Sequence, residues 1–294
     1  MNCYLHYDVF TNEHFSGNQL AVFPDETGLD AATMQRIANE MNFSESTFIL
    51  PPEHHDTDVR MRIFTPTAEL PMAGHPTVGS TFALAHEGRI ESGTEQFVFG
   101  LGIGPTPVEL EWQGDRLAFA WMVQPVPEFG TILEDRAALA RGLGLAASDL
   151  SDSLPAHFVS AGVEFLLVPL ASRTAVDSIT FNRSTLQGLF EAAGSPERGV
   201  VTFAPEPARG DGPGAYTRMV SIQGAKMGRP SRITISLATA EDSIQRVRVG
   251  GEAVLAGEGS LACSKAQVGL FCGEGRATIL FQKSFVFLQA AYPE

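Results

Sequence analysis

Two side chains in the first third of the sequence have the types and surroundings needed for acid–base chemistry. Glu45 lies in the segment FSESTFIL (43–50), and His75 lies in ELPMAGHPTVG (69–79). A carboxylate beside apolar side chains has its charged form disfavoured, so it can give or take a proton near neutral pH. An imidazole titrates in the same range. The pair therefore predicts a proton-transfer site.

Each residue also has a plainer explanation. Judged on its local sequence alone, Glu45 is best explained as an exposed strand residue, since glutamate is rarely buried. His75 precedes a helix and could simply cap it. The two segments taken together, rather than either residue alone, support the prediction.

Glu45 and His75 are predicted to lie on a strand and at a helix start. Residues 44–50 form a strand that ends at two prolines, because proline cannot continue a ladder of hydrogen bonds. The helix begins at His75 and ends at Gly88, and it is apolar on almost every side, which is typical of a buried helix. Free backbone N–H groups at its start, beside Gly74, can bind a carboxylate.

The remaining elements follow from hydrophobic periodicity. A helix capped by Asp30 has apolar residues at helical spacing. The proline-rich passage 125–130 is expected to be a boundary. Strands are predicted over 3–10, 19–23, 59–63, 96–101, 106–112, 116–122, 157–170, 199–203, 216–222, 232–237 and 244–255, with helices near 134–143 and 184–193.

Composition and charge restrict the choice of partner. With 294 residues, 44% of them hydrophobic, the chain is long enough for two domains or one large one. The net charge of −14 would repel nucleic acid and anionic membranes, so neither is expected as a partner. The N-terminus MNCYLHYDVF lacks the pattern of a signal peptide, and we expect a cytoplasmic protein.

The three cysteines, Cys3, Cys263 and Cys272, indicate neither a disulfide framework nor a metal site. Their number is odd, and no histidine flanks them at metal-ligand spacing. We expect no structural zinc.

Five segments of the chain have unusual motifs in a fixed order: YDVFTNEHFSGNQLAVF (7–23), MNFSESTFIL (41–50), RIFTPTAELPMAGHPTVGS (62–80), QGAKMGRPSRI (223–233) and VGGEAVL (249–255). Together they closely resemble the phenazine-biosynthesis PhzF-like family. The resemblance is specific over residues 4–120, patchy from 125 to 215, and present again at 216–261.

The resemblance implies an α+β, diaminopimelate-epimerase-like fold. In that fold two similar domains each wrap a mostly antiparallel sheet around a central helix, with the active site between them. It also implies a homodimeric isomerase that needs no cofactor and acts on a small-molecule carboxylate. Glu45 corresponds to the family's proton-shuttling glutamate, and His75 to the histidine of its Gly-His-Pro motif. Asn18, Ser44 and Gly74 are expected to bind the substrate.

The second half departs from the family pattern. Family members carry a Glu-Asp-Pro-Ala-Thr-Gly-Ser-Ala segment, whose aspartate and serine contact the substrate opposite the glutamate. This sequence lacks that segment and passes from AYTRMVSI directly into QGAKMGRPS. The surroundings of Asp211 do not match the motif, so no role is transferred to it. An internal deletion, an unusual splice product or a divergent replacement would each explain this departure and the atypical C-terminus.

We therefore predict a first domain over 1–125, a second domain without its central-helix motif over 126–261, and an atypical tail over 262–294. Losing a central helix removes burial at about 1.5–3 kcal/mol per large side chain. Either the tail, with its apolar stretch ATILFQKSFVFLQAAY, fills the gap as a strand or a helix, or the second domain is poorly ordered.

Two other functions fit parts of the sequence. An amino-acid epimerase needs two opposed thiols, but LACS (261–264) lacks the glycines that follow such a thiol, and Gly74 and His75 stand where the partner would be. A non-catalytic relative, which could be a small-acid binder, a protein-interaction scaffold or an inactive isoform, would fit the missing half-site. The leading hypothesis is an isomerase of a small carboxylic acid that acts through Glu45.

Overall fold

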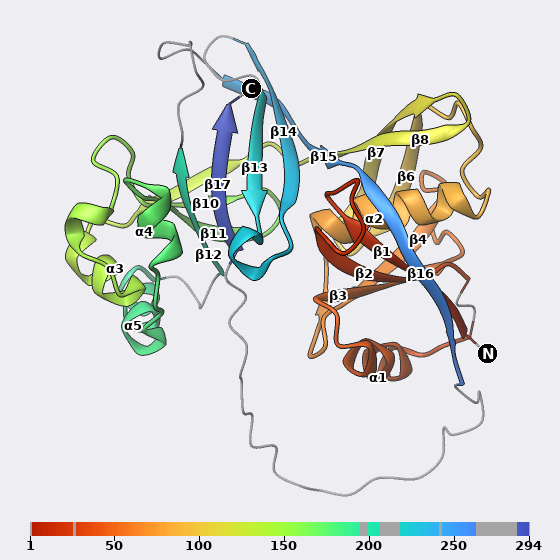
Figure 1. Cartoon of the computed structure of the whole chain (residues 1–294), viewed down its shortest axis with the longest axis horizontal. Coiled ribbons are helices and arrows are strands. Elements are labelled where there is room, and N and C mark those ends of the chain that lie inside the picture. Colours follow the sequence, from red (N-terminus) through yellow and green to blue (C-terminus); the bar gives the residue numbers. More distant parts are fainter. Residues whose placement is uncertain are drawn as a thin grey trace, which may run out of the picture.

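The computed structural model shows a sheet-dominated α+β fold with two lobes (Figure 1). The first lobe contains β1–β8, β16, α1 and α2; the second contains β9–β14, β17 and α3–α5, and β15 runs between them. No helix among the described residues is long and apolar enough to cross a membrane. The structure describes residues 2–25, 28–194, 199–205, 218–240, 243–262 and 287–293.

The strands and helices of the first lobe follow the sequence prediction closely. A short strand, β5, is the addition. The bounds are β1 Asn2–Val9, β2 Asn18–Phe23, α1 Ala31–Met41, β3 Glu45–Leu50, β4 Val59–Phe64, β5 Glu69–Leu70, α2 Gly74–His86, β6 Gln96–Leu101, β7 Gly104–Gln113 and β8 Arg116–Gln124.

One parallel pair of strands positions the N-terminal ends of β2 and β3 next to each other. Most neighbours in this lobe are antiparallel, but β2 runs parallel to β3 with Leu20 opposite Glu45. Parallel strands begin at the same edge of a sheet. Asn18, at the start of β2, and Ser44, just before β3, therefore lie at one edge.

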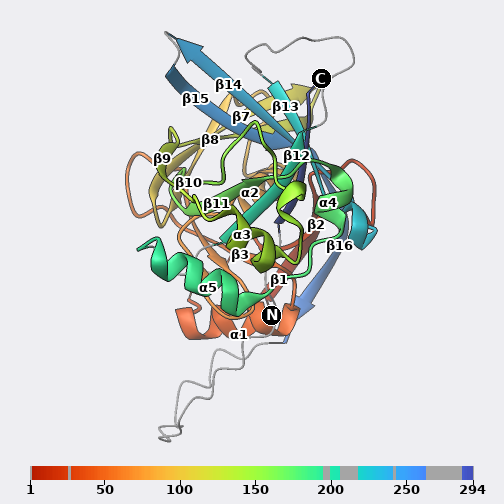
Figure 2. The same ribbon diagram turned by 90° about the vertical axis from the view of Figure 1, so that its left-hand side faces the viewer.

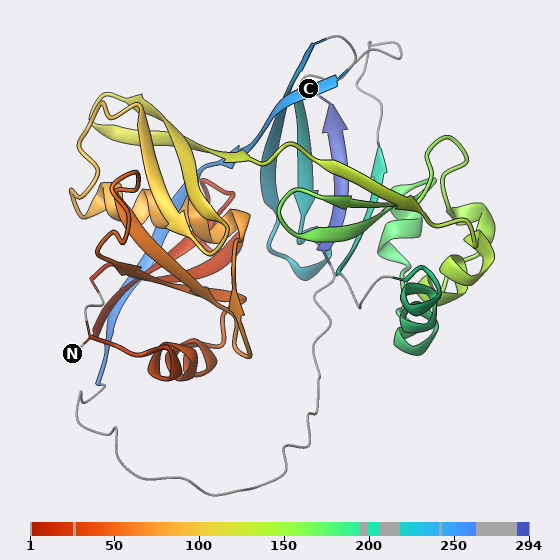
Figure 3. The same ribbon diagram turned by 180° about the vertical axis from the view of Figure 1, so that it is seen from behind.

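Helix α2 is enclosed by the strands of the first lobe (Figures 1 and 3). Every residue from His75 to Leu84 is buried, as its apolar sequence predicts. The approach is close at Gly79, where a Cβ atom would lie 2.5 Å from Leu20 Cδ2 and 2.6 Å from Val9 Cγ2. Glycine therefore lets α2 pack directly on β1 and β2.

Helix α1 lies on the outside of the same lobe and buries one face. The Asp30 side chain accepts a hydrogen bond of 2.8 Å from Thr33 N, so the predicted cap is confirmed. Met34, Ile37 and Ala38 are buried, and Asn42 ends the helix in a left-handed conformation.

The second lobe has its own apolar core and carries its helices on the outer side (Figure 2). Strand β9 overlaps the last residues of the proline-rich passage 125–130, and α4 is an addition to the predicted elements. The bounds are β9 Glu128–Ile132, α3 Arg136–Leu143, η1 Ala147–Asp149, β10 His157–Ser160, β11 Glu164–Pro169, α4 Arg173–Asp177, α5 Arg183–Ala192, β12 Gly199–Pro205, β13 Arg218–Gln223, η2 Ala225–Met227, β14 Ser231–Ala240, β15 Ser243–Gly251, β16 Ala253–Leu261 and β17 Phe287–Pro293.

No α-helix lies between β13 and β14 in the described range 218–240, which holds only the single turn η2. The C-terminal strand β17 lies between β12 and β13, parallel to the first and antiparallel to the second. The part of the tail that the structure describes therefore joins the second-lobe sheet as a strand.

The strand expected over 244–255 is two strands. β15 pairs with β14 and β8, whereas β16 returns to the first lobe and pairs with β1. The chain bends at Glu252, whose carbonyl accepts hydrogen bonds from Phe10 N and Thr11 N. The predicted division into domains at 125 and 261 stays a prediction.

Candidate active site

Glu45 and His75 meet inside the first lobe. Glu45 is the first residue of β3, and His75 is the second residue of α2. Glu45 Oε2 and His75 Nε2 are 3.1 Å apart, and the two residues are only 5% and 7% exposed. The strand glutamate is therefore buried, contrary to the plainer explanation from its local sequence.

The facing atoms of this pair have no hydrogen-bond partner. Although Glu45 Oε2 and His75 Nε2 are within ion-pair distance, their geometry does not make a hydrogen bond, and neither atom finds another partner. Buried polar atoms are nearly always satisfied, so such exceptions need an explanation. An unsatisfied carboxylate oxygen beside an unsatisfied imidazole nitrogen is suited to receive or donate a proton.

The environment favours the neutral form of His75. Burial lowers the pKa of the ring below its ordinary value, while the charge of Glu45 and a backbone hydrogen bond at Gln19 act in the opposite direction. The net direction is downward, because removing an imidazolium from water is costly. His75 is thus uncharged near neutral pH.

Asn18 and Ser44 orient the imidazole from its other side. The Asn18 side-chain nitrogen lies 3.2 Å from His75 Nδ1. Ser44 Oγ donates a hydrogen bond of 2.7 Å to Asn18 Oδ1. With the amide oxygen toward Ser44, its NH2 group faces His75 Nδ1. In the tautomer that accepts this contact at Nδ1, the proton of the neutral ring is on Nε2.

The start of α2 offers backbone N–H groups without a side-chain cap. The N-cap residue is Ala73, which makes no side-chain hydrogen bond to the first turn. A Cβ atom placed on Gly74, the first helical residue, would have no atom within 4 Å. An uncapped helix N-terminus favours negative charge, so this end of α2 can accept a carboxylate. The structure thus brings all five predicted site residues to one place.

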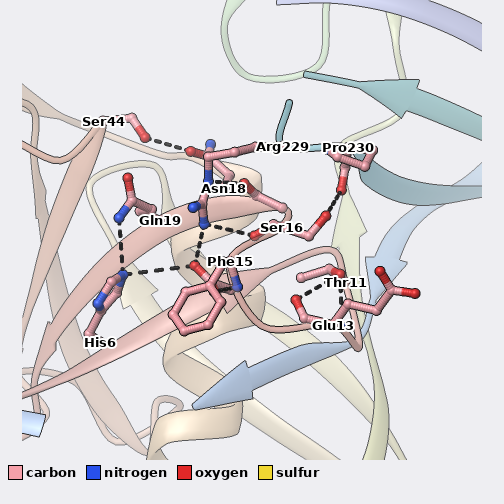
Figure 4. Close-up of polar contacts among 12 residues, drawn as sticks. His6, Thr11, Glu13, Phe15, Ser16, Asn18, Gln19, Ser44, Arg229 and Pro230 are labelled. Atoms are coloured by element: carbon pink, nitrogen blue, oxygen red, sulfur yellow. Dashed lines mark hydrogen bonds and ion pairs between the residues drawn. The ribbon is translucent and has the colours of Figure 1, made fainter. Parts of the chain in front are cut away.

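Sequence reasoning missed the residues that hold the loop before Asn18. Arg229 donates from Nη2 to Asp8 Oδ1 at 2.5 Å and to the Ser16 carbonyl at 2.8 Å. Figure 4 shows this contact with Ser16 and, further along, the bond between Ser44 and Asn18. Arg229 lies in the QGAKMGRPSRI segment. An arginine among turn-forming glycines was the only sequence feature there that could have indicated a positioning role.

A groove of about 810 Å³ opens elsewhere on the first lobe, and its lining includes His54, Arg60, Arg62 and Glu69. None of the five predicted site residues lines it. Both arginines are paired with glutamates, so this groove adds nothing to the acid–base site. Asp211, Cys263 and Cys272 lie outside the described residues.

Comparison with known proteins identifies the class. The model of the phenazine biosynthesis-like protein family, PhzC-PhzF, matches residues 7–221. An uncharacterised isomerase of Mesorhizobium japonicum is 36% identical, covering 88% of this chain and 98% of its own length. The trans-2,3-dihydro-3-hydroxyanthranilate isomerase of Pseudomonas aeruginosa is 33% identical, with 88% and 99% covered.

Solved structures agree on the fold. A predicted epimerase from Pseudomonas aeruginosa has a TM-score of 0.74 at 28% identity, covering 90% of this chain and 100% of its own. A protein of Agrobacterium radiobacter described as a probable proline racemase has the same fold with a TM-score of 0.54 at 12% identity, covering 91% of this chain and 95% of its own. The predicted α+β, diaminopimelate-epimerase-like fold is confirmed.

These relatives support a small-molecule isomerase. The chain belongs to the phenazine biosynthesis-like family and is an isomerase of the PhzF kind.

Proposed function

We propose that the protein moves a proton between two carbons of a small carboxylic acid, with Glu45 as the acid–base group and His75 beside it. The supporting observation is the pair itself. Two buried polar atoms face each other at 3.1 Å without hydrogen-bond partners, next to an uncapped helix start.

The start of α2 would hold the substrate carboxylate. Its N–H groups and partial positive charge favour an anion, and Gly74 leaves room for a close approach. The same positive end stabilises the negative charge that develops when a proton leaves the adjacent carbon. Asn18 and Ser44 keep His75 oriented toward that position.

The proposed reaction consumes and releases no net proton. The Glu45 carboxylate takes a proton from a carbon next to an unsaturated system, the electron pair delocalises, and the same carboxyl group returns the proton to another carbon. The net result is an isomer of the substrate, with no other reactant consumed. Because relatives are named trans-2,3-dihydro-3-hydroxyanthranilate isomerases, we propose an unsaturated cyclic carboxylic acid as the substrate class.

Deuterium incorporation tests this proposal. Wild-type protein in heavy water should place deuterium on carbon in trans-2,3-dihydro-3-hydroxyanthranilate or a simpler cyclic carboxylate. Glu45→Gln should lower the rate about 10²–10⁴-fold, the range typical of a lost acid–base group. Glu69→Gln, a surface change in the same lobe, is the control and should exchange normally.

Two other results would change the proposal. A Glu45→Gln protein as active as the parent would remove Glu45 from the mechanism. Binding of the carboxylate without exchange in wild-type protein would favour a small-acid binder or interaction scaffold.

The family resemblance also supports a homodimer, and we propose this assembly together with the cytoplasmic location expected from the sequence. Light scattering coupled to size-exclusion chromatography would test the assembly by giving twice the chain mass of 31.5 kDa.

A further inference from the structure

The loop that precedes Asn18 is held in place by residues from the second half of the chain. At its beginning, Phe10 N donates to the Glu252 carbonyl at 2.8 Å, and Arg232 N donates to the Phe10 carbonyl at 2.7 Å. At its end, Gly17 N donates to the Pro230 carbonyl at 3.0 Å. The loop is part of the first lobe by sequence but depends on later segments for its conformation.

Arg229 makes the densest set of these contacts. Beyond its bonds to Asp8 and the Ser16 carbonyl, its Nε donates to the Gly17 carbonyl at 3.1 Å. Its neighbour Pro230 accepts from Ser16 Oγ at 2.8 Å (Figure 4). A guanidinium presents several donors in a rigid fork, so one side chain can fix two successive carbonyls and a carboxylate.

Asp8 contacts the same loop from within the first lobe. We call Asp8, Arg229 and Pro230, which together hold residues 15–17, the clamp. It is 1% exposed, and its second oxygen accepts a hydrogen bond of 2.7 Å from Phe15 N. A buried carboxylate needs a partner, and Arg229 is 2.5 Å away. Residues 15–17 therefore make hydrogen bonds to Asp8 in the first lobe and to Arg229 and Pro230 in the second.

The clamp is continuous with the candidate active site. Gly17 has a φ of +65°, and a Cβ atom there would lie 2.3 Å from the Val9 carbonyl oxygen. This tightly packed backbone conformation therefore requires glycine. The next residue is Asn18, whose amide contacts His75 Nδ1. A shift of the clamp would thus move the amide that orients the imidazole.

We propose that Arg229 is a positioning residue, which holds residues 15–17 so that the Asn18 amide keeps His75 with its Nε2 proton toward Glu45. The proposal rests on the proposed function in taking Glu45 and His75 as the site. It gives the second lobe a role in catalysis that does not require it to supply an acid or a base.

Nitrogen NMR of the histidine side chains tests the proposal without a substrate. Spectra of protein with ¹⁵N-labelled histidine show which ring nitrogen carries the proton, and His75→Gln assigns the signal among the seven histidines. Wild-type protein should show a single tautomer protonated on Nε2. Arg229→Gln and Asn18→Ala should each give a mixture of tautomers. Amide exchange should quicken at Phe15 and Gly17 in Arg229→Gln.

The matched control is Arg246→Gln. Arg246 on β15 also reaches a first-lobe carboxylate, Glu109 on β7, but it does not touch the clamp. Because Arg229→Gln leaves the buried Asp8 carboxylate without its guanidinium partner, the double variant Asp8→Asn/Arg229→Gln removes both charges and keeps the comparison valid if the single variant does not fold. Arg229→Lys keeps the charge without the fork and should give an intermediate result.

Kinetics adds a second readout if the wild-type protein exchanges deuterium. Misplaced acid–base groups should lower kcat of Arg229→Gln by about 10–100-fold with little change in KM. The proposal would be overturned if the tautomer of His75 were unchanged in Arg229→Gln, or in the double variant where the single variant does not fold. An equal change of tautomer in Arg246→Gln would also overturn it. Absence of exchange in wild-type protein would count against the proposed function only, since the tautomer comparison stands without it.

Discussion

The two lobes differ in what lies against their sheets. In the first lobe, α2 is enclosed by strands, and His75 at its uncapped N-terminus lies 3.1 Å from Glu45. In the second lobe, the described range 218–240 passes from β13 to β14 through a single turn, and the helices α3–α5 lie outside. The difference places the acid–base pair and the uncapped helix start in one lobe.

The second lobe contributes by a different physical means. It supplies Arg229 and the Pro230 carbonyl, which bind backbone groups of the loop before Asn18. Positioning by backbone contacts does not depend on a second central helix. A chain without the family's Asp-Pro-Ala-Thr-Gly-Ser segment can therefore still organise its first-lobe site.

The largest effect on this comparison is expected from ending the chain at Leu261. This change removes β17, which pairs with β12 on one side and β13 on the other. Each lost backbone hydrogen bond contributes about 0.5–1.5 kcal/mol net, so the second lobe should lose several-fold more than a typical point mutation costs. Amide exchange should accelerate strongly in β12 and β13 and little in α2.

Limited proteolysis provides the check on that prediction. If the second lobe of the shortened chain resists cleavage as well as the first lobe does, the tail does not compensate for the missing helix. The second-lobe core would then be sufficient by itself.

A smaller effect is expected from two glycines of α2 that have opposite surroundings. Gly79→Ala would place a methyl group against Leu20 and Val9, and overpacking costs about 1–3 kcal/mol. That exceeds the roughly 1 kcal/mol by which alanine favours a helix over glycine. Urea unfolding should show a lower free energy of unfolding for Gly79→Ala than for wild type.

Gly74→Ala is the matched change at the helix start. No atom lies within 4 Å of the added Cβ, so stability should hold. The methyl group would, however, obstruct a carboxylate approaching the helix N-terminus, and KM for deuterium exchange should rise. An unchanged KM would show that the substrate does not approach the backbone at Gly74.

Local patterns were sufficient to predict the first lobe but not the paths of the late strands. The buried helix α2 follows from a sequence without a polar face, and the α1 cap follows from Asp30. Gly250 and Gly251 mark a bend before Glu252, but the new path of the chain depends on hydrogen bonds to Phe10 and Thr11, which are far away in sequence. Pairing between distant strands depends on tertiary context that periodicity does not contain.

The same limit applied to the site. The types of Glu45 and His75 indicated acid–base chemistry, the helix start indicated a carboxylate site beside Gly74, and the family resemblance added Asn18 and Ser44. Asp8 and Arg229 are 221 positions apart, so their contact could not be derived from spacing. It became visible only when the loop before Asn18 was seen against the second lobe.

The smallest expected effect is a pH dependence of stability that originates in the first lobe. The pKa of buried His75 is lowered, so between that lowered pKa and about pH 6.5 the unfolded chain binds a proton there and the folded chain does not. The free energy of unfolding should therefore fall as the pH falls, by at most about 1.4 kcal/mol per pH unit for this residue. His75→Gln removes that proton-binding site, so the urea midpoint of the variant should vary less between pH 7.5 and 5.5.

His6 should retain part of the pH dependence, because burial lowers its pKa as well. If the free energy of unfolding depended on pH equally in wild type and His75→Gln, His75 would not be protected from water in the folded state. The buried Glu45–His75 pair would then no longer distinguish the first lobe from the second.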